Sequence, residues 1–227
     1  MNKQDCIELQ QKLNALGAGL KVDGVYGPKT QAAEAKYLGE KPAALKPENP
    51  AYREAKKHAG KTEFMAAFRS FLVPFWSKVG LPGYKTLIGT SFAWCGLFIA
   101  AMNTETGLSI VKGAAGARNW AKSGVAIDWR ANGIPRGAVM HINGNGNCSS
   151  GSGNHVTFAD GDCTVEDLAR LKQVPGYGGN QGNAVKRSMY PVKNVCAVRW
   201  PAEIEKPGPV LQSFNCAGGG SSGESTR

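Results

Sequence analysis

The feature of this sequence that most constrains its folding is a proline-rich stretch at residues 39–50 that separates two parts of unequal length. It reads GEKPAALKPENP and carries three prolines and four charged residues, a composition that favours exposed, semi-extended chain. We therefore expect a linker here. It joins a small module at residues 1–38 to a larger domain at residues 51–206, and a flexible tail at residues 207–227 follows.

The first module is predicted to be all-α, with two helices on either side of one tight turn. Asp23 and Gly24 are typical turn residues, Gly27 can cap, and Pro28 suits the first position of a second helix. The first helix is indicated by apolar residues that recur with helical spacing at Ile7, Leu9, Leu13 and Leu16.

The larger domain is predicted to be α+β, with helices preceding a small antiparallel sheet. Helical patterns occupy residues 51–60, 62–79 and 94–106. Short runs bounded by Gly, Pro, Asn or Asp predict strands at residues 138–142, 155–159, 174–178 and 195–200. The stretch GNGNCSSGSGN between the first two strands predicts a flexible loop.

Composition limits the possible functions. A hydrophobic content of 42% excludes a disordered or fibrous chain, and the formal charge of +10 favours a polyanionic partner such as nucleic acid, an anionic envelope polymer or a membrane surface. No apolar run approaches the ~20 residues of a membrane span, and the amino terminus lacks the apolar stretch of a secretory signal. We expect a monomer made in the cytoplasm without a signal peptide.

The six cysteines are too few for a disulfide scaffold, and no CxxC pair indicates zinc, so most are predicted to be plain thiols. Any pairing among four of them stays open: Cys148, Cys163, Cys196 and Cys216. Cys95 differs from the others because it lies in SFAWCGLFIAAMN, where a polar turn meets an apolar helix. Helix-start amides stabilise a thiolate, so the pKa of Cys95 is expected to be lowered.

A thiol nucleophile needs a base, and the chain has three histidines. His58 lies among lysines and is expected to be solvated, whereas His141 lies well inside a strand. His155 begins a strand directly after the glycine-rich loop, and we prefer it as the base. Asn180 in GYGGNQGNAV is the candidate that orients the imidazole.

These motifs resemble known families. LQQKLNALG, VDGVYGPKT and AAEAKYL resemble the peptidoglycan-binding module of cell-wall hydrolases. AWCGLFIAAMN, GNHVTFADG and GGNQGNAVKRSMYP resemble, in order and spacing, papain-like cysteine amidohydrolases and peptidases of the CHAP and NlpC type. The resemblance implies Cys95 as nucleophile, His155 as general base and acid, and Asn180 as orienting residue. Asn154 replaces the usual glycine before the histidine and Gly178 replaces a frequent glutamate, so Gln181 is a second candidate for the orienting role.

The resemblance predicts a phage endolysin that cleaves an amide bond of bacterial peptidoglycan after release from the cytoplasm. No cofactor or metal is expected, because the sequence has no HExxH motif and no complete phosphate-binding loop. Substrate contacts are expected from Trp94, Gly179 and Gln181, and wall contacts from Asp23 and Tyr26.

Two alternative functions remain open from the sequence, and a third is disfavoured. The chain could be a cell-wall-binding protein without catalysis, or a bacterial toxin or autolysin with the same catalytic domain. Nucleic-acid binding is disfavoured because the basic residues are scattered rather than forming one stripe interleaved with aromatic residues. The bond cleaved is equally open: it joins sugar to alanine, as in an amidase substrate, or links two amino acids, as in an endopeptidase substrate.

Overall fold

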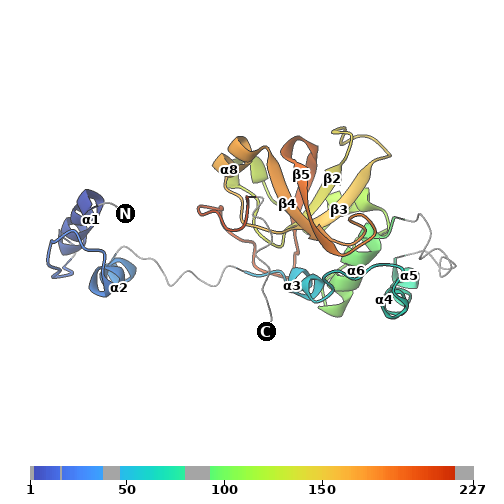
Figure 1. Ribbon diagram of the computed structural model, residues 1–227, viewed down its shortest axis with the longest axis horizontal. Coiled ribbons are helices and arrows are strands. Elements are labelled where there is room, and N and C mark those ends of the chain that lie inside the picture. The colour runs from blue at the N-terminus through green and yellow to red at the C-terminus, as the bar shows by residue number, and fades with distance from the viewer. Residues whose placement is uncertain (1–2, 16, 38–46, 80–92, 218–227) are drawn as a thin grey trace. The chain divides into compact units, whose positions relative to one another are not determined.

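The computed structural model describes residues 3–15, 17–37, 47–79 and 93–217, and it divides into two compact units between Lys46 and Pro47 (Figure 1). Most of the linker predicted at residues 39–50 lies outside the described residues. No described helix has the length and apolar character needed to cross a membrane.

The first unit contains the two predicted helices, α1 (Lys3–Ala15) and α2 (Pro28–Tyr37). The buried side chain of Gln10 on α1 holds the turn between them. Its Oε1 accepts hydrogen bonds from the backbone N–H groups of Asp23 (3.1 Å) and Gly24 (2.9 Å), and its Nε2 donates to the Asp23 carboxylate (3.0 Å). One buried amide thereby satisfies polar groups that the turn itself leaves unpaired.

The second unit is α+β and is built on a six-stranded antiparallel sheet with the order β1-β6-β2-β3-β4-β5. Its strands are β1 (Val125–Ala126), β2 (Val139–Asn143), β3 (Asn154–Ala159), β4 (Gln173–Gly178), β5 (Lys186–Pro191) and β6 (Val195–Trp200). The four predicted strands correspond to β2, β3, β4 and β6, so the α+β prediction and these strand positions are confirmed.

Helix α6 (Cys95–Glu105) is the central helix of the unit, and nine of its eleven residues are buried. It packs on β3 together with α3 (Pro50–Lys56), α4 (Ala66–Leu72) and α5 (Phe75–Lys78), which gather around it on one side of the sheet in Figure 1. A helix that is apolar on every side is stable only when other elements surround it. This packing fixes the position of Cys95, the first residue of α6.

The opposite face of the sheet carries a second core, which includes Leu168 from α8 (Val165–Leu171) and Trp129 from α7 (Trp129–Asn132). The remaining short helices are η2 (Ala117–Lys122) and η3 (Val192–Asn194). The sequence pattern does not predict α7, α8, β1 and β5. Thr164 and Asp167 form a capping box at the start of α8. Their spacing in the sequence is typical of a helix start.

One helix prediction and one prediction of side-chain exposure are corrected. The helix predicted at residues 62–79 is divided into α4 and α5 around Pro74, because proline has no N–H to donate to the carbonyl four residues earlier and its ring clashes with that carbonyl. His58 was predicted to be solvated, but it is 7% exposed and packs among phenylalanines, stacking on Phe71 with ring centroids 4.7 Å apart. The imidazole is shielded from solvent because it packs against Phe68 and Phe71 of α4.

The cysteine and tail predictions are also corrected. Cys148 pairs with Cys196 and Cys163 with Cys216, and only Cys6 and Cys95 are free thiols. The paired cysteines are 48 and 53 residues apart, a spacing that does not reveal pairing in the sequence. The tail predicted to be flexible from residue 207 is instead held as far as residue 217, because the Cys216 disulfide and the backbone bonds between Phe214 and Asp162 tie it to the sheet unit.

Candidate active site

Cys95 lies at the start of α6, as predicted, and its sulfur lies beside β3. The backbone N–H groups of Val156, Gly96 and Cys95 lie near enough to the sulfur to oppose the rise in the pKa of the thiol. β3 pairs with β4 only at Phe158 and Ala159, so this ladder does not extend to Val156. The N–H of Val156 has no partner in β4 and lowers the pKa of the thiol.

The expected lowering of the Cys95 pKa is wrong in direction. The side chain is buried, with Cys95 only 2% exposed, and this burial raises the pKa of the thiol more than the three backbone N–H groups lower it. The helix-start amides therefore act as predicted, but they are outweighed. The resting sulfur is a neutral thiol at neutral pH.

His155 is the second residue of β3 and precedes Val156, the residue that contacts the thiol. Its ring stacks on Tyr190 of β5, with centroids 5.6 Å apart and planes inclined by 26°. Its Nε2 is buried without a hydrogen-bond partner among the described residues. Burial lowers the pKa of His155 to about 4, so the imidazole is neutral and able to accept a proton at pH 7.

Tyr190 stacks on the His155 ring and responds electrostatically to Cys95, and the sequence pattern does not predict this position. Burial raises the pKa of Tyr190, and the charge of a Cys95 thiolate raises it further, which places the phenol within electrostatic range of the sulfur. We call Cys95, His155 and Tyr190 the thiol region. It assembles side chains from α6, β3 and β5, and the period-two alternation of β5 was the only sequence signal that could have indicated Tyr190.

The predicted hydrogen bond between Asn180 and His155 is not formed in this structure. Asn180 follows β4 with a left-handed backbone (φ 57°), and its side chain has no hydrogen-bond partner among the described residues. Gln181 is 4% exposed and its Nε2 donates to Thr157 Oγ1 at 2.9 Å, two residues along β3 from His155. Of the two amides, only that of Gln181 is tied to the strand that carries the histidine.

Trp94 and Gly179, predicted to contact substrate, pack against each other in the core. Trp94 is 1% exposed and makes edge contacts with Phe68 and Phe98. A Cβ atom on Gly179 would lie 2.3 Å from the Trp94 ring, so only glycine permits this approach. Their role in this structure is to position the start of α6.

His141 occupies a different environment on β2, which we call the loop region together with Asn143, Asn154 and the Cys148–Cys196 disulfide. His141 is 2% exposed, and its Nε2 hydrogen-bonds to Asn154 Oδ1 at 2.7 Å. Asn143 Nδ2 also donates to Asn154 Oδ1, at 3.3 Å, and to the backbone carbonyl of Ser152. Asn154, which stands where the resembled family has glycine, thus anchors the loop.

In the first unit, the two residues predicted to bind the wall, Asp23 and Tyr26, lie in different environments. A cavity of about 600 Å³ is lined by Gln10, Asp23 and Thr30, among others. The hydrogen bond from Gln10 is the main cause that lowers the pKa of Asp23, so this carboxylate is engaged inside the module. Tyr26 is 41% exposed and donates its hydroxyl to Glu34, and it does not line the cavity.

No protein-family model, curated protein sequence or solved structure matches this chain. Within the part of the chain that the structure describes, no group of three or more His, Cys, Asp or Glu side chains is arranged to hold a metal ion.

Proposed function

We propose that this protein is a peptidoglycan hydrolase of the endolysin type, with a papain-like domain that cleaves an amide bond through Cys95. The observation that carries the proposal is the position of Cys95 at the start of α6 near the backbone N–H of Val156, the residue that follows His155 on β3. A nucleophile at a helix start beside a base on a strand is the arrangement that covalent acyl transfer needs.

In the proposed reaction, His155 takes the thiol proton as the Cys95 sulfur forms a bond to the amide carbonyl carbon. The oxyanion of the tetrahedral intermediate accepts a hydrogen bond from the backbone N–H of Cys95 at the start of α6. The imidazolium then gives its proton to the leaving amine as the C–N bond breaks, leaving a thioester. His155 deprotonates a water that attacks the thioester, and the carboxylic acid and the thiol are released.

The resting state of this pair is neutral. Burial disfavours both the thiolate and the imidazolium, so proton transfer must accompany substrate attack rather than precede it. The low exposure of Cys95 also means that a wall peptide reaches the sulfur only when neighbouring groups move aside.

The proposed substrate rests on the resemblance of both parts of the chain to cell-wall hydrolases and on charge. A formal charge of +10 would concentrate the protein on anionic wall polymers. The test uses the full chain and purified peptidoglycan, with turbidity as the measure of lysis and mass spectrometry to identify the bond cleaved. Cys95→Ala should abolish lysis and still sediment with walls.

Cys6→Ala is the matched control, because Cys6 is the other free thiol and is equally buried. It should lyse walls at the rate of the unmodified protein. The burial of Cys95 favours one rival function, a wall-binding protein without catalysis. No fall in turbidity with the unmodified protein, while it still sediments with walls, would support that rival and reject the proposed hydrolase. Equal lysis by Cys95→Ala and the unmodified protein would reject Cys95 as the nucleophile.

A further inference from the structure

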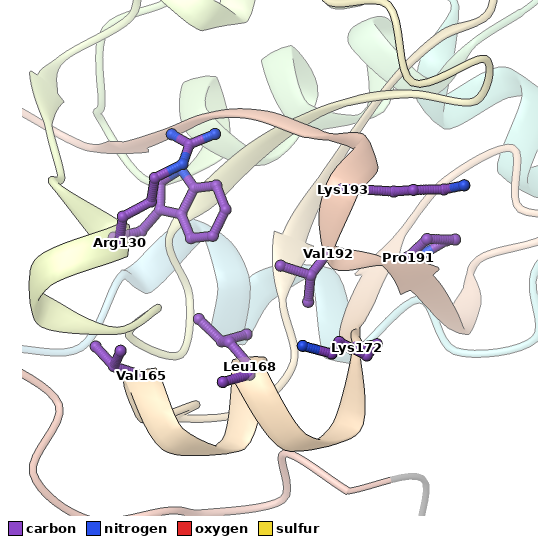
Figure 2. A pocket seen from close by; sticks show the side chains of 9 residues that line it. Arg130, Val165, Leu168, Lys172, Pro191, Val192 and Lys193 are labelled. Carbon is purple, nitrogen blue, oxygen red and sulfur yellow. The ribbon is translucent and has the colours of Figure 1, made fainter.

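A second cavity lies in the sheet unit, among α7, α8 and η3, and it shares no residue with the thiol region (Figure 2). Its volume is about 600 Å³, within the range of small-molecule sites. Its nine lining residues are Trp129, Arg130, Val165, Leu168, Ala169, Lys172, Pro191, Val192 and Lys193.

The sequence of α8 explains one wall of this cavity. Val165, Leu168 and Lys172 recur at helical spacing and therefore share one face of the helix and its end. The C-terminal end of α8 is fastened to η3, because the Lys172 carbonyl accepts a hydrogen bond from the Val192 N–H at 2.9 Å. The cavity is therefore bounded by elements that are joined to one another.

The floor of the cavity is apolar and recessed. Leu168 is 4% exposed and Trp129 is 7% exposed, while Val165 at the rim is 41% exposed. A bilayer surface would require apolar side chains that project outward, as they do on interfacial helices. A recessed apolar floor instead suits one molecule that enters the cavity.

The charged residues that line the cavity are all cations: Arg130, Lys172 and Lys193. None of them forms an ion pair with another described residue. Figure 2 shows the Lys172 ammonium pointing toward Leu168 and Val192, whereas Lys193 extends away from them. The Arg130 guanidinium stacks over the Trp129 ring at 4.2 Å, which holds a second cation over the floor.

We propose that this cavity binds a single-chain anionic amphiphile, with its apolar chain on the floor and its carboxylate or phosphate paired with Lys172 and Arg130. A purely polar anion would leave the apolar floor exposed to water. A cationic amphiphile would place like charges together. The inference concerns a separate site and does not depend on the proposed hydrolase activity.

The test measures binding of decyl phosphate and of decanoate to the full chain by calorimetry, below the concentration at which either forms micelles. The two probes distinguish a phosphate headgroup from a carboxylate. Inorganic phosphate and decyltrimethylammonium serve as the purely polar and the cationic counterparts. One-to-one binding of at least one anionic amphiphile, and of neither counterpart, is expected.

Two variants at exposed positions test the two halves of the site. Ala169→Phe fills the cavity without changing charge and should remove binding. Lys172→Glu should weaken binding roughly tenfold or more, because a charge-assisted pair is replaced by repulsion. Lys112→Glu makes the same charge change at an exposed residue outside the cavity and should alter affinity less than about twofold.

Failure of the unmodified protein to bind either anionic amphiphile would overturn the proposal, as would equal binding of decyltrimethylammonium. Unchanged affinity in both cavity variants would also overturn it. Sedimentation with phosphatidylglycerol vesicles tests whether the same surface contacts a membrane instead. If the variants reduce vesicle binding while no single amphiphile binds, the surface contacts a membrane and the cavity proposal is wrong.

Discussion

The thiol region and the loop region each contain one histidine with a buried ring nitrogen, on the neighbouring strands β3 and β2, but they are built differently. In the loop region the Nε2 of His141 is engaged by Asn154, which also ties the loop to the strand. In the thiol region the Nε2 of His155 is buried without a described partner, and its ring rests on Tyr190. Each ring has one buried nitrogen without a described partner, Nε2 in His155 and Nδ1 in His141. The two regions therefore differ in the neighbours of the imidazole, which are the Asn154 amide for His141 and the Tyr190 ring for His155.

Under the proposed function, His155 takes part in the chemistry and His141 anchors the loop. His155→Ala should lower the rate of wall lysis by about 10²- to 10⁴-fold, because general acid–base catalysis typically contributes this much. His141→Ala should retain activity within about tenfold, although it should unfold more easily. Lysis rates corrected for the folded fraction measure both effects. An equal loss in the two variants would remove the distinction between the regions.

The loop region should be the more sensitive to loss of its disulfide. Replacing Cys148 and Cys196 together by Ser removes a crosslink between residues 48 apart, which should lower the free energy of unfolding by about 3–4 kcal/mol. Urea unfolding measures this change. Activity at low temperature should stay within a few-fold of the unmodified protein, because the thiol region keeps all its residues. A specific loss of lysis in the folded variant would show that the loop shapes the active site.

The two histidines should also contribute unequally to the pH dependence of stability. The pKa of His155 falls from 6.5 to about 4 on folding, so the unfolded chain binds the proton more readily. Stability from this group is present above pH 6.5 and is lost as the pH falls toward 4, by up to about 3 kcal/mol. The pKa of His141 is also lowered by burial, but its hydrogen bond to Asn154 opposes the shift.

Urea unfolding at pH 7 and at pH 4.5 tests this difference. His155→Phe should reduce the loss of stability between the two pH values more than His141→Phe does. Far-UV circular dichroism at pH 7 establishes that each variant is folded before the comparison. A larger reduction with His141→Phe would contradict the stated order.

Much of the sheet unit follows from the sequence, because apolar runs bounded by turn residues predict strands and the apolar run after Cys95 predicts a buried helix. β5 was missed because KRSMYP mixes charged and polar residues, as an edge strand with one hydrogen-bonded neighbour can. Missing β5 also meant missing Tyr190. The local sequence pattern also does not predict burial. The direction of the Cys95 pKa shift depends on how many atoms surround the sulfur, and those atoms belong to segments distant in the sequence.

The smallest predicted effect tests whether Tyr190 positions the thiol region beyond packing against His155. Tyr190→Phe keeps the ring and removes the hydroxyl, so the stacking on His155 should survive. If the hydroxyl donates to the developing thiolate, its loss should raise the pKa of Cys95 by roughly one unit, about 1–2 kcal/mol, and slow lysis several-fold. The rate of alkylation of the folded protein by iodoacetamide, followed from pH 6 to pH 10, reports this titration directly.

Tyr177→Phe is the matched control for that experiment. Burial raises the pKa of Tyr177 to about 12, and the nearby Asp160 carboxylate contributes, but Cys95 does not. Its hydroxyl is buried on β4 without a described hydrogen-bond partner, so removing it changes packing and hydration without touching the sulfur. The alkylation profile of Tyr177→Phe should therefore match that of the unmodified protein. Parallel shifts in the two variants would mean that the thiol responds to general loosening of the sheet, and Tyr190 would then belong to the core rather than to the site.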